Sequence, residues 1–263
     1  MWHKGHEMTK DASVTRILCT GASGALGGAL ASLHAAPGVH LSLWGRDRTR
    51  LGLIAEKVSH AGAEAQAFCL DLTDGQAAID AVLSQDKEAP FDLAYLVAGI
   101  GDTRAKGDLV ENPELVLRAA QVNFATPAAM AAAIAGRMAE RGHGRIVVIG
   151  SAAGHHSLPF AAGYSGSKAG LARFTDALRI AVESYGVSVT LAAPGFIDTP
   201  STRNASSSRP IELSVEEAAR RIIEAGRKGM RHYVTPWQFS ALRMVDALLP
   251  ARLRDRLLSK LQP

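Results

Sequence analysis

The sequence is poor in cysteine and has no long apolar run. Its two cysteines among 263 residues, Cys19 and Cys69, lie in apolar stretches, so we expect buried, reduced thiols and no disulfide framework. The apolar run Ala128–Gly136 is far shorter than the roughly 20 residues that span a bilayer. Residues 1–12 lack the apolar core of a secretory signal, and we expect a flexible terminus there. These absences predict a cytoplasmic protein.

Two kinds of binding site also lack support in the sequence. The net charge is only +4, and no cluster of lysine and arginine is interleaved with aromatic residues, which argues against binding to nucleic acid. The adjacent histidines His155 and His156 have no neighbouring cysteine or carboxylate, so no metal site is predicted. The chain is thus expected to need neither nucleic acid nor a metal ion.

Short β-rich runs alternate with longer helical segments such as Arg48–His60. Several of the runs are apolar almost throughout, as in central strands that are covered on both faces. The expected strands are Val14–Thr20, Val39–Trp44, Ala65–Asp71, Phe91–Val97, Arg145–Ser151, Val187–Ala193 and His232–Pro236. The alternation predicts an α/β protein, a single-domain Rossmann fold over residues 13–236. Its doubly wound parallel sheet should have about seven strands, with helices on both faces.

Two segments depart from this alternation. Residues Asp198–Ser214 are polar and rich in serine, proline and arginine, which predicts a mobile loop. Residues 237–263 form an amphipathic, basic helical tail that is interrupted at Pro250. The apolar stripe of this tail favours packing or an oligomer contact, and peripheral membrane association at the inner face is the alternative.

The stretch "CTGASGALGG" joins the first expected strand to a helical segment. Its glycines Gly21, Gly24 and Gly27 fall at every third residue. In a doubly wound sheet the first strand–helix turn takes a pyrophosphate, since glycines admit the phosphates to the N–H groups at the helix start. A tight turn with close helix packing is the alternative, because three glycines alone are a weak signal.

The residue after the second strand indicates the cofactor. An enzyme that prefers NAD(H) usually has an acid here for the ribose 2′-hydroxyl. This chain has Gly45 and then Arg46, whose guanidinium suits a 2′-phosphate, so NADP(H) is favoured over NAD(H). Arg48 and Arg50 are read as the solvated face of the next helix.

The strongest pattern is "GYSGSKAGL". Tyr164 and Lys168 are four residues apart in a helical segment and therefore share one face. A nearby cation lowers the pKa of a tyrosine, which predicts that Tyr164 acts as a general acid/base. Ser151 ends an apolar strand at the sheet edge where the cofactor should lie, and its hydroxyl is placed to bond a substrate oxygen.

In these residues the chain resembles the short-chain dehydrogenase/reductase family, from Arg16 to Pro236. The matching motifs, in order, are "TGASGALG", "LDLTD" (Leu70–Asp74), "AGI" (Ala98–Ile100), "VN" (Val122–Asn123), the set Ser151, Tyr164 and Lys168, and "PGFIDT" (Pro194–Thr199). Within this family, the chain is weakly similar to reductases that act on sugars of polyprenyl-phosphate carriers or polysaccharides.

The resemblance implies roles for individual residues. The catalytic set would be Asn123, Ser151, Tyr164 and Lys168, with Asn123 holding a water that links Lys168 to solvent. The cofactor-binding set would be Gly21, Ser23, Gly24, Ala25, Leu26, Gly27, Arg46, Asp71, Leu72, Ala98, Gly99, Tyr164, Lys168, Pro194, Gly195, Ile197 and Thr199. His155 and His156 stand where the family lines its substrate pocket and are candidate substrate contacts, with a solvated loop as the alternative. Apart from the resemblance, Arg203 and Arg209 of the polar loop are candidates for holding an anionic substrate.

Two departures keep alternatives open. Gly24 gives the glycine spacing of the family's extended branch, and Ala25 stands where the family has glycine. Val97 replaces the usual asparagine of the motif that follows the fourth strand. The function we predict is that of an NADP(H)-dependent oxidoreductase that interconverts a secondary alcohol and a ketone or aldehyde. A sugar or a lipid-linked compound is one possible substrate. A nicotinamide-dependent epimerase or dehydratase, or a non-catalytic NADP(H)-binding sensor or scaffold, is the alternative.

The resemblance also implies self-association. Members of the family form homodimers or homotetramers through their long helices, which here are expected over Glu111–Arg141 and Ala162–Tyr185.

Overall fold

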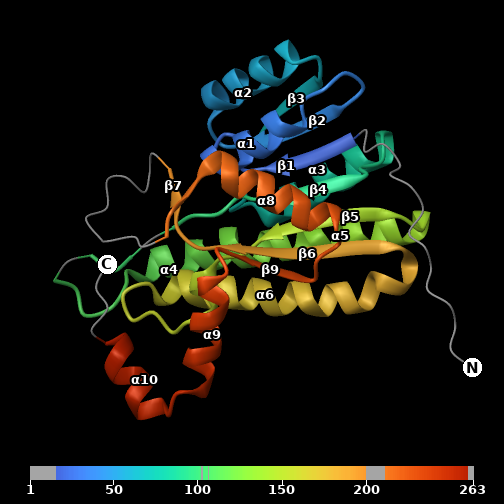
Figure 1. The fold of residues 1–263 in the computed structure, drawn as a ribbon. Coiled ribbons are helices and arrows are strands. Elements are labelled where there is room, and N and C mark those ends of the chain that lie inside the picture. The colour runs from blue at the N-terminus through green and yellow to red at the C-terminus, as the bar shows by residue number, and fades with distance from the viewer. Residues whose placement is uncertain (1–15, 102, 106, 200–210, 260–263) are drawn as a thin grey trace, which may run out of the picture.

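Seven parallel strands form the centre of the fold (Figure 1). The computed structural model describes residues 16–101, 103–105, 107–199 and 211–259. The strands lie in the order β3-β2-β1-β4-β5-β6-β9, and each neighbouring pair is parallel. Their bounds are Arg16–Thr20 (β1), His40–Gly45 (β2), Glu64–Cys69 (β3), Leu93–Leu96 (β4), Gly144–Ile149 (β5), Val187–Pro194 (β6) and His232–Thr235 (β9). The order reverses between β1 and β4, which is the switch point of a doubly wound sheet, so the predicted fold class is confirmed.

Helices cover both faces of this sheet, as predicted. Alternate side chains of a strand point to opposite faces, so Ile17 and Leu18 of β1 enter different cores. Ile17 lies in the core closed by α1, α2 and α8, and Leu18 lies in the core closed by α3, α5 and α6. The helix bounds are Ala25–His34 (α1), Arg48–His60 (α2), Gly75–Glu88 (α3), Pro113–Ala120 (α4), Thr126–Arg141 (α5), Ala162–Val182 (α6) and Val215–Arg227 (α8).

The helical segment expected over Glu111–Arg141 is interrupted. Asn112 caps α4 by accepting hydrogen bonds from the N–H groups of Glu114 and Leu115, and α4 ends at Ala120. A π-helical turn, η1 (Gln121–Ala125), then joins α4 to α5. Such turns insert one extra residue into a helix, and they are frequent at functional sites. This turn carries the fully buried Asn123.

The two cysteines differ from the expectation that both are buried. Both thiols are free, and Cys19 of β1 is buried, but Cys69 at the end of β3 is exposed. The reason is the position of β3, which forms one edge of the sheet and shows mostly exposed residues. An apolar run in the sequence does not reveal which strand lies at the edge.

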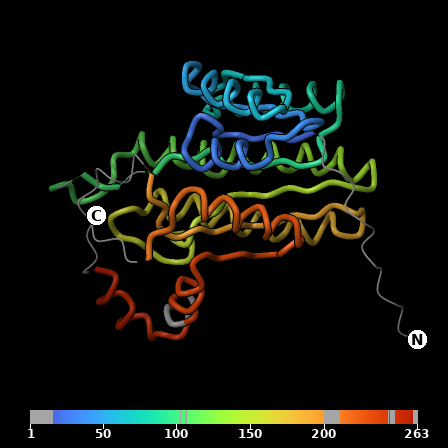
Figure 2. The backbone as a smooth tube through the Cα atoms, turned by 45° about the horizontal axis from the view of Figure 1, so that its top comes forward, coloured from blue at the N-terminus to red at the C-terminus, as the bar shows by residue number. Residues whose placement is uncertain are grey.

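The chain ends in two short helices at one corner of the molecule. Helix α9 (Gln238–Leu248) follows β9, and α10 (Ala251–Leu258) follows the break at Pro250. Figures 1 and 2 both show these helices projecting beside α6 and β9. Two short paired strands, β7 (Ile197–Asp198) and β8 (Leu213–Ser214), stand at the ends of the segment expected to be a mobile loop. Its residues 200–210 lie outside the described part of the chain.

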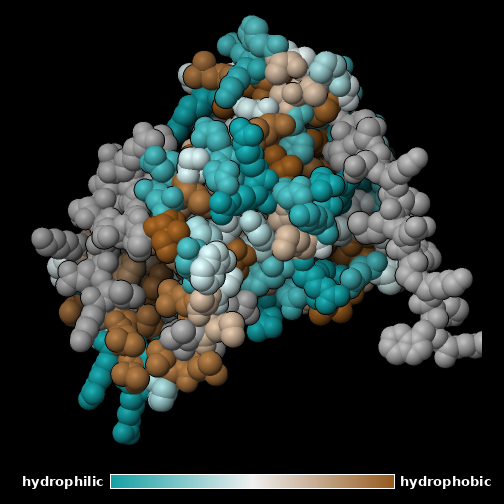
Figure 3. Space-filling view, viewed as in Figure 1, coloured by the Kyte–Doolittle hydropathy of each residue, from teal (hydrophilic) through white to brown (hydrophobic). Residues whose placement is uncertain are grey.

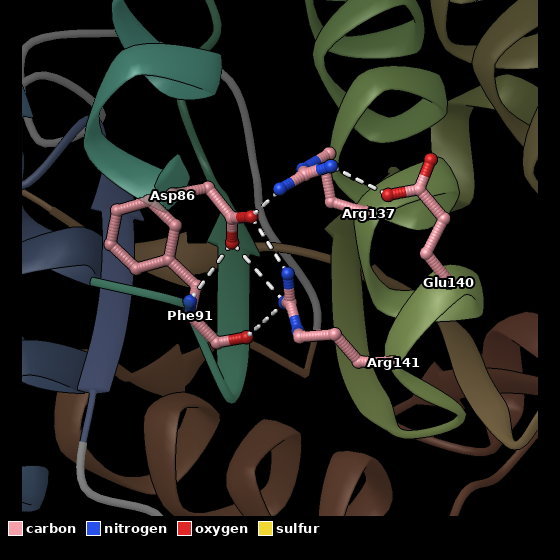
Figure 4. A network of polar contacts seen from close by, with 5 residues as sticks. All are labelled: Asp86, Phe91, Arg137, Glu140 and Arg141. Atoms are coloured by element: carbon pink, nitrogen blue, oxygen red, sulfur yellow. Dashed lines mark hydrogen bonds and ion pairs between the residues drawn. The ribbon is translucent and has the colours of Figure 1, made fainter. Parts of the chain in front are cut away.

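A buried ion network links α3 and α5 to the segment before β4, at the amino ends of the strands (Figure 4). The carboxylate of Asp86, on α3, is 1% exposed and accepts the N–H of Phe91 at 3.0 Å. Arg141, on α5, donates to Asp86 at 2.7 Å and to the carbonyl of Phe91 at 3.1 Å. The Nε of Arg137 lies 3.5 Å from the same carboxylate. This network lies at the end of the sheet away from the glycine turn, so its role is structural.

Candidate active site

The glycine turn between β1 and α1 forms a cradle of bare backbone. Gly21 adopts a φ of +67°, in the left-handed region that favours glycine. A Cβ on Gly27 would lie 2.3 Å from the carbonyl oxygen of Gly21, so only glycine lets α1 approach the turn this closely. Gly24, the N-cap of α1, offers no side-chain acceptor to the first N–H groups of the helix. These groups therefore fit a pyrophosphate, which binds at helix N-termini in this way.

The carboxyl end of β2 lies against the same glycine turn. A Cβ on Gly45 would lie 2.5 Å from the Oγ of Ser23, so the turn lies against the end of β2. Arg46 follows and is exposed, and its carbonyl accepts from the thiol of Cys69 at 3.3 Å. The N–H of Thr73 holds the pKa of Asp71 below its usual value, with a smaller contribution from the charge of Arg46. Arg46 and Asp71 thus share one polar corner.

The neighbouring acid Asp47 is committed to helix α2. Its carboxylate accepts the N–H of Arg50 at 2.9 Å and pairs with the Nε of Arg50 at 2.6 Å. Asp47 is therefore the N-cap of α2, and its charge is already matched by Arg50.

Thr20, which the sequence analysis did not single out, holds the switch point. Its Oγ1 accepts the N–H groups of Val97 at 2.9 Å and of Ala98 at 3.2 Å. The hydroxyl thereby ties the end of β1 to the segment that follows β4, at the position where Val97 replaces asparagine. The sequence signal for this role was a threonine immediately before the first glycine. At that position the side chain can reach the end of the neighbouring strand β4.

Asn123 joins the segment after β4 to helix α6. Its Nδ2 donates to the carbonyl of Ile100 at 2.9 Å, and its Oδ1 accepts the N–H of Ile100 at 2.8 Å. The Nδ2 also lies 3.2 Å from the Oγ of Ser167. A Cβ on Gly99 would be 3.1 Å from Asn123 Oδ1 and 3.3 Å from Lys168 Nζ, so the structure brings these predicted residues together.

Ser151, Tyr164 and Lys168 converge between β5 and α6. The side chain of Ser151 reaches the phenol of Tyr164, and Ser151 Oγ accepts the N–H of Ala153 at 3.2 Å. The Nζ of Lys168 donates to the carbonyl of Ile149, the last residue of β5, at 2.8 Å. Burial lowers the pKa of Lys168 to about 8.

The pKa of Tyr164 moves in the direction opposite to the one expected. Burial of the phenol raises this pKa above its ordinary value, and the hydrogen bond with Ser151 only partly offsets the rise. The expected net lowering of the Tyr164 pKa is therefore wrong for this arrangement. The physical reason is that the ammonium of Lys168 bonds the carbonyl of Ile149, while desolvation disfavours the phenolate.

The other predicted residues stand on several elements of the fold. Leu72 is buried, and its carbonyl accepts from the Oγ1 of Thr126 at 2.7 Å. Pro194 ends β6, and the N–H of Gly195 donates to the carbonyl of Thr235 at 2.8 Å. Ile197 and Thr199 follow at the start of the partly described segment, while Ala25 and Leu26 open α1. Arg203 and Arg209 lie outside the described residues.

His155 and His156 line a cavity next to α6 and α10. The rings of His155 and His232 are 5.1 Å apart, edge to face. The loop 154–159 borders a cavity of about 560 Å³ together with Ser165 of α6 and Leu258 of α10. Ser151 and Tyr164 are not among the described residues that line this cavity. Substrate contact by the two histidines stays a prediction.

No helix within residues 16–101, 103–105, 107–199 and 211–259 is both long enough and apolar enough to cross a membrane. In the same part of the chain, no group of three or more histidine, cysteine or acidic side chains is placed to hold a metal ion.

A Rossmann sheet with a glycine cradle and a serine–tyrosine–lysine set defines a nicotinamide-dependent oxidoreductase. A family model described as short chain dehydrogenase matches residues 15–210. An uncharacterized oxidoreductase of Myxococcus xanthus is 31% identical over 239 residues, which cover 90% of this chain and 94% of that protein. A 3-oxoacyl-acyl-carrier-protein reductase of Escherichia coli is 30% identical over 205 residues, 78% and 82% of the two chains.

A solved structure has the same fold. It is a short-chain dehydrogenase from Sphingobium yanoikuyae in complex with NADPH, with 26% identity, a TM-score of 0.77, and coverage of 94% of this chain and 96% of that chain. The protein belongs to the short-chain dehydrogenase/reductase family. It is an NAD(P)-dependent dehydrogenase or reductase.

Proposed function

We propose that this protein is an NADP(H)-dependent oxidoreductase that interconverts a secondary alcohol and a ketone or aldehyde. The observation that carries the proposal is the placement of the Ser151 side chain against the phenol of Tyr164, with the buried Lys168 on the same helix. Two hydroxyls that meet at the carboxyl edge of the sheet suit one carbonyl oxygen, which accepts both.

The cradle residues would hold the cofactor. The N–H groups at the start of α1 would bind its pyrophosphate, and the exposed Arg46 would bind a 2′-phosphate. The acid that could bind a 2′-hydroxyl instead, Asp47, already caps α2 and pairs with Arg50. The NADPH in the Sphingobium relative supports the same preference. When bound, the nicotinamide supplies or takes up the hydride.

The side chains of this chain would manage the proton. In reduction, the phenol of Tyr164 would donate its proton to the substrate oxygen, while the hydroxyl of Ser151 donates a hydrogen bond to that oxygen. A raised pKa keeps the phenol protonated near neutral pH, as a general acid requires. Lys168 would place its positive charge near the phenolate that is left, and the proton would return from solvent.

The tail supplies the reason to include lipid-linked substrates and peripheral membrane contact. The side chains of Leu248 on α9 and Leu253 on α10 are 81% and 47% exposed. Arg252 and Arg256 are exposed on α10, beside the leucines. Figure 3 shows hydrophobic residues gathered at the corner that these helices occupy, with hydrophilic side chains projecting from it. Apolar and basic side chains together suit an anionic lipid surface, so we place the protein in the cytoplasm with access to the inner membrane face.

Self-association through the long helices is part of the same proposal. Ile180, on α6, is 62% exposed, and its helix has one face turned away from the sheet. A homodimer or homotetramer would cover that face.

A screen of ketones, aldehydes and ketosugars with NADPH oxidation as the readout tests the proposed function. We expect net consumption of NADPH with at least one carbonyl compound. Turnover without net NADPH consumption would favour the epimerase or dehydratase alternative. NADPH binding without turnover of any carbonyl or sugar would favour a sensor or scaffold.

A further inference from the structure

The first turn of α6 carries Tyr164 but has no local cap. Its N-cap is Ala161, which cannot accept a hydrogen bond through its side chain, and the turn contains no acidic residue. A helix that starts in this way leaves its first N–H groups in need of an acceptor from elsewhere. Tyr164 is the third residue of the helix, so any looseness of this turn moves the phenol directly.

Glu111 supplies the acceptor from 52 residues away. Its Oε2 accepts the N–H of Gly163 at 2.8 Å, and the bond is partly buried. A carboxylate at a helix N-terminus also interacts favourably with the helix dipole, and a charged acceptor makes a stronger hydrogen bond than a neutral one. The bonded N–H belongs to the residue that immediately precedes Tyr164.

The backbone around Glu111 is itself held in place. Asn112 caps α4 through the N–H groups of Glu114 and Leu115, and Pro113 fixes the first helical residue. A Cβ on Gly163 would lie 3.3 Å from the Cα of Val116, so α4 rests directly on the first turn of α6. The carboxylate therefore reaches Gly163 from a capped helix start that is packed against its target.

A second polar link holds the other side of Tyr164. The Oγ of Ser167 donates to the carbonyl of Tyr164 at 2.8 Å and accepts from Asn123 at 3.2 Å. The N–H group before the tyrosine is thus bonded to Glu111, which precedes α4, and the carbonyl of the tyrosine is linked through Ser167 to Asn123 of η1. This pattern fixes the tyrosine along the helix axis and in rotation.

We infer that Glu111 is a positioning residue for Tyr164. It does not touch the reacting atoms, and it acts by holding the turn from which the phenol extends. The inference rests on the proposed function for its kinetic consequence, but the hydrogen bond that carries it does not depend on the substrate.

The test compares three variants of the full chain. E111A removes the acceptor, E111Q keeps an acceptor oxygen without the charge, and E114A removes an exposed carboxylate three residues further along as the matched control. We expect E111A to lower kcat about tenfold with the Kd for NADPH and the KM for the carbonyl substrate changed less than about twofold, since misplacement of a reacting group costs rate. E111Q should recover most of kcat, and E114A should resemble the wild type.

A substrate-free measurement accompanies the kinetics. Hydrogen–deuterium exchange of the amides at the start of α6 should be about tenfold faster in E111A than in the wild type, intermediate or unchanged in E111Q, and unchanged in E114A. Unchanged exchange and unchanged kcat in E111A would overturn the inference. So would a loss in E111A that appears as weaker NADPH binding and lower thermal stability at constant kcat.

The two proposals fail in different ways. If Y164F keeps full activity, the proposed function is wrong, whereas the exchange result for E111A still decides whether Glu111 holds the turn. If Y164F is inactive while E111A keeps the wild-type kcat and exchange, only the positioning role of Glu111 is wrong.

Discussion

The Nζ of Lys168 donates a 2.8 Å hydrogen bond to the carbonyl of Ile149, which joins the helix of Tyr164 to the strand that leads to Ser151. The bond is buried, so it is stronger than the same bond in water, and it links α6 to the end of β5. The side chains of Ser151 and Tyr164 lie next to each other beyond this link. This pair of side chains at the carboxyl edge of a parallel sheet is the arrangement on which the proposed chemistry rests.

Arg46 should determine the preference for the phosphorylated cofactor. We expect R46A to weaken NADPH binding by about tenfold or more and NADH binding very little, because a charge-assisted contact to a 2′-phosphate is lost. R48A, which removes an exposed arginine two residues further along, is the control and should change neither affinity. Titration of both nucleotides against protein fluorescence measures the effect. Equal losses for the two nucleotides in R46A would show that Arg46 does not read the phosphate.

The stability of the protein should depend on pH through His34. Its Nε2 is hydrogen-bonded to the hydroxyl of Tyr95 at 2.9 Å, and burial lowers its pKa from 6.5 to about 4. The unfolded chain takes up a proton at this site from about pH 6.5 downward, while the folded chain does so only near pH 4. The contribution of His34 is therefore fully present above pH 6.5 and is lost as the pH falls toward 4.

Denaturant unfolding at several pH values measures this contribution. Between pH 7 and pH 4 the wild type should lose about 2 kcal/mol more free energy of unfolding than H34Q. H60Q, at an exposed histidine, should follow the wild type. Parallel curves for the wild type and H34Q would contradict the assignment.

The tail should bind anionic membranes through its leucines. We expect the wild type to sediment with vesicles that contain anionic lipid and not with neutral vesicles, and we expect the double variant L253S/L257S to lose this binding. Both leucines are about half exposed on α10. L53S, at an exposed leucine of α2, is the matched control. Wild-type binding by the double variant, or a change in its oligomeric mass instead, would assign the tail to packing or self-association.

Much of the fold could be predicted because it depends on local patterns. The strands are continuous apolar runs, and parallel strands bring their carboxyl ends to one edge, so Gly21, Ser151 and Tyr164 were placed together from spacing alone. The exposure of Cys69 was not predictable, since the order of strands decides which of them forms the edge.

The contacts that hold the site were beyond the sequence for a related reason. Glu111 and Gly163 are 52 residues apart, and Thr20 and Val97 are 77 apart, so their bonds exist only after the elements have packed. The pKa of Tyr164 was predicted in the wrong direction because spacing shows that Lys168 is near but not that its ammonium bonds Ile149. Burial and partner choice are properties of the packed structure.

The activity of Y164F is the most direct measurement of the proposed chemistry. With a carbonyl substrate found in the screen, removal of the phenol oxygen should reduce kcat for NADPH oxidation by roughly 100-fold to 10,000-fold, which is the range for loss of a general acid. The Kd for NADPH should stay within about threefold of the wild type, because the cradle of α1 is untouched. Wild-type turnover by Y164F would contradict the assignment of Tyr164 as the proton donor.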